Sequence, residues 1–253
     1  MNSESHNVPT ASEQASYWDA WNAKCREAEL PPRVQRQAEV VVGWLRKIRR
    51  ENLKILDVGC GTGWLCALLL PFGAITGIDF TAEVLDRARS RMPKVRFITG
   101  DFLQADLKEQ FDVVVAMEVI SHFADQPAFI HKCGEALRPG GYLMLATQNK
   151  YVYERRAETQ PPSPSQVRKW LTARTMRQMI ETDFEILEVT SVCPDGYQGL
   201  LRLVNSIRLN QLVAHVVPQS RLDEWKERKL LGMTLMALAR KAPGERESRR
   251  HNA

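Results

Sequence analysis

A glycine-rich turn preceded by an acidic residue offers the clearest chemistry in this sequence. Residues 53–65 read LKILDVGCGTGWL, so Asp57 stands just ahead of Gly59, Gly61 and Gly63. Glycine permits the positive φ and the close backbone approach that a tight strand-to-helix turn needs. A carboxylate beside such a turn can stabilise it, and it can also attract the cationic end of a ligand. The segment therefore predicts a turn that leaves room for a nucleoside.

Two more carboxylates follow the next two predicted strands. Asp79 ends one strand, and Asp101 follows the other within Gly100-Asp101-Phe102. A carboxylate in the position of Asp79 can accept hydrogen bonds from both ribose hydroxyls. Asp101 can accept from an adenine amino group or cap its own loop, and Phe102 can pack near the base. Because the carboxyl ends of parallel strands meet at one edge of a sheet, the acids are expected to converge on one adenosyl ligand.

The spacing of the glycines separates two classes of nucleoside ligand. The turn reads G-x-G-x-G, whereas the dinucleotide fingerprint is G-x-G-x-x-G. S-adenosylmethionine has no pyrophosphate to place on a helix N-terminus, but it has an α-amino group and a sulfonium that a carboxylate can attract. The turn therefore favours S-adenosylmethionine, although Asp79 taken alone fits NAD equally well.

Alternating apolar runs and helical patterns predict the elements that hold these residues. This alternation is typical of an α/β fold with a mostly parallel sheet and helices on both faces. Right-handed crossovers are the default for such connections. Thr81 and Thr172 each precede a helical pattern and are expected to cap it. The predicted strands are 54–58, 74–79, 95–99, 111–116, 142–147, 184–192 and 230–240.

The rest of the chain is expected to surround this sheet. We expect one domain over residues 15–240, with helices in 15–50 and a helical cap, 195–229, inserted before the last strand. Residues 1–14 and 241–253 are predicted to be disordered because they are polar. The cap mixes apolar and polar positions, so it is interpreted as a lid that contacts the substrate, with interface or core packing as the alternative.

Composition limits the class of protein without identifying it. The chain has 253 residues, of which 44% are apolar and 26% charged, as in ordinary globular proteins. A net charge of +5 is compatible with a nucleic-acid partner, but most of the excess reads as solvated charge at a helix end and in the tail. No apolar run reaches the length of a membrane span. A reducing cytoplasm is expected because five cysteines are scattered along the chain: Cys25, Cys60, Cys66, Cys133 and Cys193.

At this point the sequence resembles the class I S-adenosylmethionine-dependent methyltransferases. The resemblance covers residues 40–150 and includes the turn with Asp57, the acids Asp79 and Asp101, and LRPGG at 137–141 before a strand. It implies a Rossmann-like seven-stranded sheet whose last strand is antiparallel, and an N-terminal helix that closes over the cofactor. The expected cofactor contacts are Tyr17, Trp21, Asp57, Gly59, Cys60, Gly61, Gly63, Asp79, Phe80, Gly100, Asp101, Phe102, Met117 and Glu118.

The segment after the fourth predicted strand, AMEVISHF at 116–123, bears on the methyl acceptor. It lacks the Asn/Asp-Pro-Pro-aromatic clamp of enzymes that methylate nucleobase amino groups, and no Pro-Cys nucleophile is present, so a nucleic-acid substrate is disfavoured. It resembles the M-E-x-x-x-H stretch of small-molecule methyltransferases, including those of ubiquinone biosynthesis and sugar O-methylation. Many of these carry Glu directly before the His. Ser121 stands there in this chain, so no metal is expected.

His122 is the candidate general base, because an imidazole titrates near neutral pH. Its alternative role is to pack at a helix start or contact the cofactor. His215 is a second choice, and His131 has the position of a helix-surface residue. Gln166 occupies a place where related enzymes often have His, and an amide cannot act as a base.

The expected function is methyl transfer from S-adenosylmethionine to a hydroxyl of a small molecule, such as a natural product, a quinone-like compound or a sugar. Methylation of a small amine remains an alternative. An NAD-binding oxidoreductase and a non-catalytic cofactor-binding protein are alternatives from other classes. A homodimer is compatible with the sequence.

Overall fold

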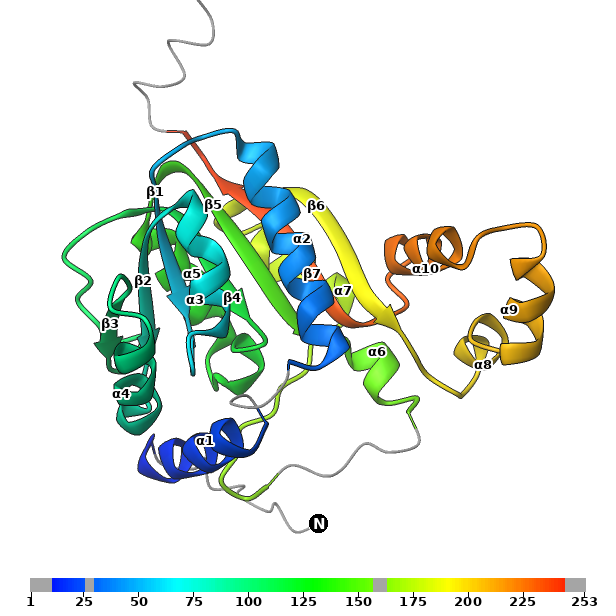
Figure 1. The fold of residues 1–253 in the computed structure, drawn as a ribbon, viewed down its shortest axis with the longest axis horizontal. Helices are drawn as coiled ribbons and strands as arrows, with labels where there is room; N and C mark the ends of the chain where they lie inside the picture. Colours follow the sequence, from blue (N-terminus) through cyan, green and yellow to red (C-terminus); the bar gives the residue numbers. More distant parts are fainter. Residues whose placement is uncertain (1–10, 26–29, 157–162, 244–253) are drawn as a thin grey trace, which may run out of the picture.

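The fold is known from a computed structural model that describes residues 11–25, 30–156 and 163–243. Its centre is a seven-stranded sheet with the order β3-β2-β1-β4-β5-β7-β6 (Figure 1). β7 pairs antiparallel with both β5 and β6, and the other pairings are parallel. The predicted Rossmann-like fold is therefore confirmed. The strands are β1 (Leu53–Val58), β2 (Gly73–Asp79), β3 (Arg96–Thr99), β4 (Phe111–Met117), β5 (Leu137–Gln148), β6 (Phe184–Pro194) and β7 (Gly232–Lys241).

Helices cover both faces of the sheet, so the central strands are buried on both sides (Figure 1). Side chains alternate across a strand, and β4 shows the result. Val113 and Val115 face a core that includes Trp44, whereas Val114 faces a core that includes Phe129. The first core belongs to α2 (Pro32–Ile48), α3 (Trp64–Leu69) and α4 (Ala82–Arg91), and the second to α5 (Gln126–Ala136) and α7 (Ala173–Ile180).

Local sequence explains where several helices begin. Pro32 starts α2, a position where its missing N–H costs nothing. Thr172 caps α7 through a reciprocal capping box with Thr175, as expected. The cap predicted at Thr81 is only partly correct. Thr81 occupies the N-cap position of α4, but its side chain makes no capping hydrogen bond. Its N–H instead donates to the carboxylate of Asp79 at 2.9 Å.

Three boundaries differ from the sequence prediction. α1 (Ala11–Cys25) begins inside the stretch predicted to be disordered, because Ala, Ser and Glu at its start are compatible with a helix. LRPGG at 137–141 is the irregular beginning of β5, not a turn before it, because Leu137 pairs with Phe111 across a bulge. A short helix, α6 (Lys150–Tyr153), follows β5, and the sequence prediction does not include it. The predicted disorder of residues 1–10 and 244–253 lies outside the described residues.

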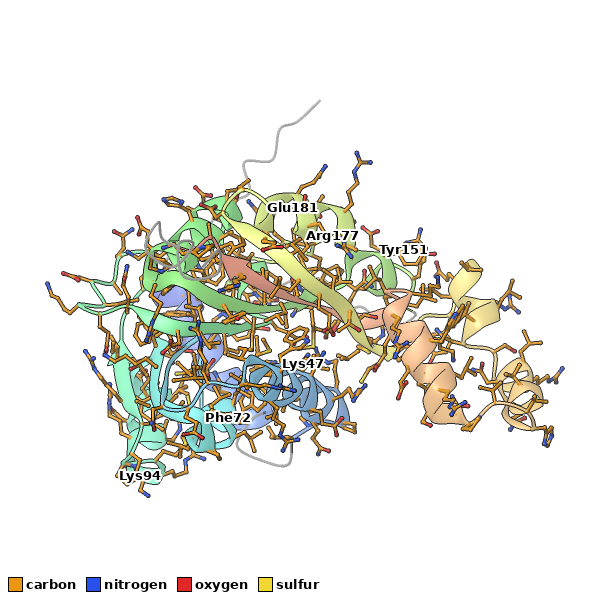
Figure 2. The ribbon with its side chains drawn as sticks, turned by 90° about the horizontal axis from the view of Figure 1, so that it is seen from above. Lys47, Phe72, Lys94, Tyr151, Arg177 and Glu181 are labelled. Atoms are coloured by element: carbon orange, nitrogen blue, oxygen red, sulfur yellow. The ribbon has the colours of Figure 1, made fainter. Side chains whose placement is uncertain are left out.

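The predicted helical cap is present between β6 and β7. It contains α8 (Leu200–Val204), α9 (Ile207–Ala214) and α10 (Gln219–Arg228). α10 packs along β6, and the Ser191 hydroxyl donates to the carbonyl of Glu227 at 2.8 Å. α8 and α9 lie farther out, beyond the end of β6, in both views (Figures 1 and 2). Lys94, after α4, lies at the opposite end of the molecule (Figure 2).

Gly73 provides a test of how closely β1 and β2 are packed. A Cβ at Gly73 would lie 2.0 Å from the carbonyl oxygen of Leu53, which is backbone and cannot rotate away. Gly73→Ala is expected to lower the free energy of unfolding by about 1–3 kcal/mol or more in urea denaturation. Gly43, inside α2, is the control because its Cβ would have no neighbour within 4 Å. Gly43→Ala is expected to raise stability by about 0.5–1 kcal/mol. Equal effects of the two substitutions would contradict this account of the packing.

Candidate functional site

A cavity of about 520 Å³ opens at the carboxyl ends of β1, β2 and β4. This is the edge where parallel sheets bind ligands, and the volume suits a small-molecule ligand. Most residues predicted from the sequence meet here: Tyr17, Trp21, Gly59, Cys60, Gly61, Asp79, Phe80, Gly100, Asp101, Phe102, Met117, Glu118 and His122 line the cavity. Asp57 and Gly63 are not among the lining residues.

The glycine turn is held against β2 by backbone hydrogen bonds. Gly59 has a φ of 68°, and its N–H donates to the carbonyl of Ile78 at 2.8 Å. A Cβ at Gly59 would lie 2.5 Å from Cγ2 of Val119, so a larger residue would displace the segment after β4. The N–H of Gly61 donates to Oδ2 of Asp79 at 2.9 Å. The turn and the predicted ribose acid are therefore one hydrogen-bonded unit.

Asp79 is a buried carboxylate at the edge of the cavity. It is 9% exposed and lines the cavity, and its oxygens accept from the N–H groups of Gly61 and Thr81, each at 2.9 Å. A carboxylate oxygen can accept more than one hydrogen bond, so a ribose hydroxyl can add to each. Burial raises the pKa of Asp79, and the backbone N–H groups counteract that rise. Asp79 thus presents carboxylate acceptors to the cavity, and its contact with a ribose stays a prediction.

Asp101 and Phe102 combine the structural and ligand-facing roles weighed from the sequence. Oδ1 of Asp101 accepts from the N–H of Leu103 at 3.0 Å, which caps the loop, and Asp101 also lines the cavity. Phe102 packs edge-on against Phe129 with ring centroids 5.4 Å apart, and it forms part of the cavity wall. Phe129, a core aromatic, therefore supports the part of the cavity wall formed by Phe102.

Asp57 lies behind the turn. It is 2% exposed, and the thiol of Cys66 donates to its Oδ2 at 3.3 Å. Burial raises the pKa of Asp57 to about 7, and the nearby Asp79 carboxylate adds to the rise, while the Cys66 bond opposes it. Gly63 stands at the N-cap of α3 with a φ of 74°. Both residues support the turn, and a direct cofactor contact by either stays a prediction.

Glu118 connects the end of β4 to two distant elements. It has a φ of 59° and is buried. Its Oε1 accepts from Gln37 Nε2 at 2.9 Å and from Thr234 Oγ1 at 2.7 Å, and it pairs with the guanidinium of Arg33. Arg33 and Gln37 belong to α2 and Thr234 to β7. Glu118 therefore joins α2 and β7 to the floor of the cavity.

His122 ends a single 3₁₀ turn after β4, Ile120–His122. Its Nδ1 lies 2.9 Å from the carbonyl oxygen of Val167. A carbonyl can only accept, so this contact places the proton of the neutral ring on Nδ1 and leaves Nε2 as an acceptor. The ring packs on Trp18 with centroids 4.3 Å apart. Burial lowers the pKa of His122 to about 4, against the opposing effects of Val167 and Glu118, so the ring is neutral at pH 7.

The second half of the cavity wall was found only in part from the sequence. Its aromatic and cationic members are Trp18, Arg33, Phe123, Tyr153, Arg156, Arg168 and Trp170. Of this part of the wall, the family resemblance points to the N-terminal helix that carries Trp18 and to the segment 116–123 that contains Phe123. The sequence pattern does not indicate Arg33, because periodicity predicts its helix but not which side chains face the site. It does not indicate Tyr153 either, because no helix is predicted where α6 forms. Gln166 also lines the cavity.

The other candidates lie outside the cavity. His131 is exposed on α5, with Nδ1 3.1 Å from an oxygen of Asp183, and His215 is exposed after α9.

The described residues contain no group of three metal-binding side chains. Within that same part of the chain, residues 195–229 contribute nothing to the cavity lining, so the predicted lid role of the cap is not supported. None of the described helices is long and apolar enough to cross a membrane.

Comparisons with known proteins agree with this geometry. The profile of the family described as "Methyltransferase domain" matches residues 24–189. The ubiquinone biosynthesis O-methyltransferase of Chelativorans sp. (strain BNC1) is 41% identical over 107 residues, 40% of this chain and 42% of the relative. That of Methylocella silvestris is 32% identical over 181 residues, 65% of this chain and 70% of the relative. The first of these matches thus spans less than half of the relative's length.

Among solved structures, the fold is similar to that of N-methyltransferase NodS from Bradyrhizobium japonicum WM9 in complex with S-adenosyl-L-homocysteine. The TM-score is 0.63 at 18% identity, over 90% of this chain and 98% of that chain. At this identity the likeness concerns the fold. The family match covers most of the chain, including the glycine turn and both cavity acids. The chain therefore belongs to the methyltransferase domain family of S-adenosylmethionine-dependent proteins.

Proposed function

We propose that this protein transfers a methyl group from S-adenosylmethionine to a hydroxyl group of a small molecule. The observation that carries the proposal is the meeting of Asp79, Asp101, the glycine turn and a neutral His122 around one cavity. S-adenosylmethionine supplies a methyl carbon already activated by its sulfonium. The protein must therefore bind the adenosyl group, hold the acceptor in line with that carbon and accept a proton.

The cofactor half of the cavity binds through fixed polar groups. Asp79 accepts from the ribose hydroxyls and Asp101 from the adenine amino group. Gly59 and Gly61 allow the backbone to approach the ligand closely. Asp57 contributes a negative charge behind the turn once it is ionised, which favours a ligand with a positive end. These groups need little rearrangement because hydrogen bonds to backbone already hold Asp79.

The acceptor half favours a planar or apolar molecule. Trp18, Phe123, Tyr153 and Trp170 line it, and such walls exclude water from the reacting atoms. Correct positioning can supply about 7–11 kcal/mol of the barrier reduction. His122 Nε2 is the group that takes the hydroxyl proton. A base whose pKa is about 4 is weak, so it works best on an acidic hydroxyl such as a phenol. We therefore favour a phenolic acceptor over a sugar.

A small amine is the second candidate acceptor. NodS, the structural neighbour, is named an N-methyltransferase, and His122 could equally take a proton from a methylated amine. Turnover with a panel of phenols and amines, followed by mass spectrometry of the product, decides between the two. Calorimetry with S-adenosylmethionine and with NAD tests the cofactor assignment. Binding of S-adenosylmethionine without turnover on any acceptor would favour a non-catalytic protein.

Asp79→Ala tests the ribose contact. Loss of a hydrogen bond to a charged group costs roughly 1.5–3 kcal/mol, so the affinity for S-adenosylmethionine is expected to fall about ten- to a hundredfold in calorimetry. Asp86→Ala is the control, because Asp86 is an exposed aspartate on α4 away from the cavity. Thermal unfolding checks that the turn survives in the variant. Unchanged affinity in Asp79→Ala would refute the ribose role.

Asp57→Asn tests the buried acid through the pH dependence of stability. The pKa of Asp57 is raised from 3.8 to about 7 in the folded state, so folding loses stability as pH rises between these values. An amide carries no charge. The free energy of unfolding of the variant is therefore expected to rise, relative to that of the wild type, by about 1.4 kcal/mol per pH unit between these two values. Above pH 7 the difference is expected to stay constant. Urea unfolding without cofactor at pH 5 and pH 8 measures this. A stability difference between variant and wild type that is the same at pH 5 and pH 8 would contradict the burial argument.

His122→Ala tests the base. Turnover is expected to fall about 10²- to 10⁴-fold while the affinity for S-adenosylmethionine is kept. The pKa of His122 is about 4, so the kcat/KM of the wild type should stay level as pH falls from about 8 to 5 and drop only as pH 4 is approached. His131→Ala, on the exposed face of α5, is the matched control. Full activity of His122→Ala with every accepted substrate would remove His122 from the mechanism.

A further inference from the structure

Exposed apolar side chains gather on the cap. Seven of the nine large apolar side chains that are exposed in the described residues lie between residues 195 and 229. Six of them belong to α8, α9 and the flanking residues: Tyr197, Leu200, Leu203, Leu209, Val213 and Val216. Val216 is 86% exposed. Scattered exposed residues need no explanation, but a concentration of this kind on one projecting segment marks an interaction surface.

α8 is anchored by one buried side chain, whereas the described side chains of α9 are exposed or half-buried. Leu201 is fully buried, and its side chain packs against Gly196 at the base of the cap. Leu200 and Leu203, three residues apart on α8, are both exposed. Leu209 and Val213, four residues apart on α9, are exposed too and share one side of that helix. The exposed apolar side chains thus lie on helices, and α8 is fixed to the base of the cap through Leu201.

The charged side chains of residues 196–217 are all basic. Residues 196–217 read GYQGLLRLVNSIRLNQLVAHVV and contain no aspartate or glutamate. Arg202 and Arg208 are both exposed there, and so is His215. The rest of the chain carries all 30 acidic residues. Clustered basic and apolar side chains on an amphipathic surface are the combination that binds the interface of an anionic membrane.

The described part of the protein does not use this surface internally. No described residue of 195–229 lines the cavity, and only α10 of the cap packs along the sheet. α8 and α9 extend beyond the end of β6 in both views (Figures 1 and 2). We propose that α8, α9 and residues 215–217 dock on an anionic lipid bilayer. The leucine and valine side chains enter the headgroup region, and Arg202 and Arg208 pair with lipid phosphates.

A second copy of this chain fits the surface less well. A two-fold contact would place each patch against its own copy. Both arginines of each copy would then lie in one interface, and no acidic residue within 196–217 of either copy would compensate them. An anionic bilayer supplies the missing charge, so charge complementarity favours lipid as the occupant.

Vesicle flotation of the full chain tests the proposal. The protein is expected to float with vesicles of phosphatidylcholine and phosphatidylglycerol, and much less with phosphatidylcholine alone. Arg202→Gln with Arg208→Gln should weaken partitioning about 30-fold, and added salt should weaken it too. The double substitution Leu203→Ser and Leu209→Ser should weaken partitioning onto the vesicles by about tenfold or more. The controls are Leu187→Ser, an exposed leucine on β6, and Lys94→Gln at the opposite end of the molecule.

Each possible result of the flotation experiment either supports or overturns membrane docking. Flotation that depends on phosphatidylglycerol and is lost in the cap variants but kept in both controls supports the proposal. Absence of flotation by the folded wild type, or flotation unaffected by the cap variants, overturns it. A dimer in analytical ultracentrifugation that dissociates in Leu203→Ser with Leu209→Ser, without flotation, also overturns it and assigns the surface to a second copy. The arginine variant changes only exposed side chains, so it remains informative if the leucine variant fails to fold.

Discussion

The buried carboxylate of Asp79 holds the cofactor side of the site together. It accepts one N–H from the glycine turn and one from the start of α4, so three consecutive segments of the chain share a single side chain. Burial makes that charge costly, and the two backbone N–H groups make it tolerable. The shape of the turn and the position of the ribose acceptor therefore depend on each other. A second buried acid, Asp57, lies close enough to Asp79 for each charge to disfavour the other.

The sheet and the cofactor half of the site could be predicted because their signals are local. Strands buried on both faces appear in the sequence as apolar runs. Asp79 ends one such strand, β2, and Asp101 follows the edge strand β3. The acceptor half could not be predicted, because it depends on pairing across the chain. Arg33 meets Glu118 across 85 positions of sequence, and no periodicity announces such a contact. Thr81 shows a subtler failure. Threonine is a residue that often caps a helix. In this structure the backbone N–H of Thr81 donates to Asp79, and the hydroxyl of Thr81 makes no capping hydrogen bond.

The cap illustrates what an amphipathic pattern leaves undecided. The sequence predicts its helices, but it does not show whether each apolar face packs against the rest of the protein or faces outward. A lid and an outward-facing surface have the same composition. The structure separates them, because α10 lies against β6 whereas α8 and α9 turn their exposed leucines away from the cavity.

The hydrogen bond between His122 and Val167 has a consequence for how this protein can diverge. The acceptor is a main-chain carbonyl, which every amino acid possesses. The position of the imidazole proton is therefore insensitive to which side chain occupies residue 167. Neighbouring wall positions such as Gln166 and Arg168 can drift toward new acceptors while the imidazole keeps its tautomer. If His122 acts as the proposed base, substitutions at residues 166 and 168 can change the cavity wall without changing the state of that base.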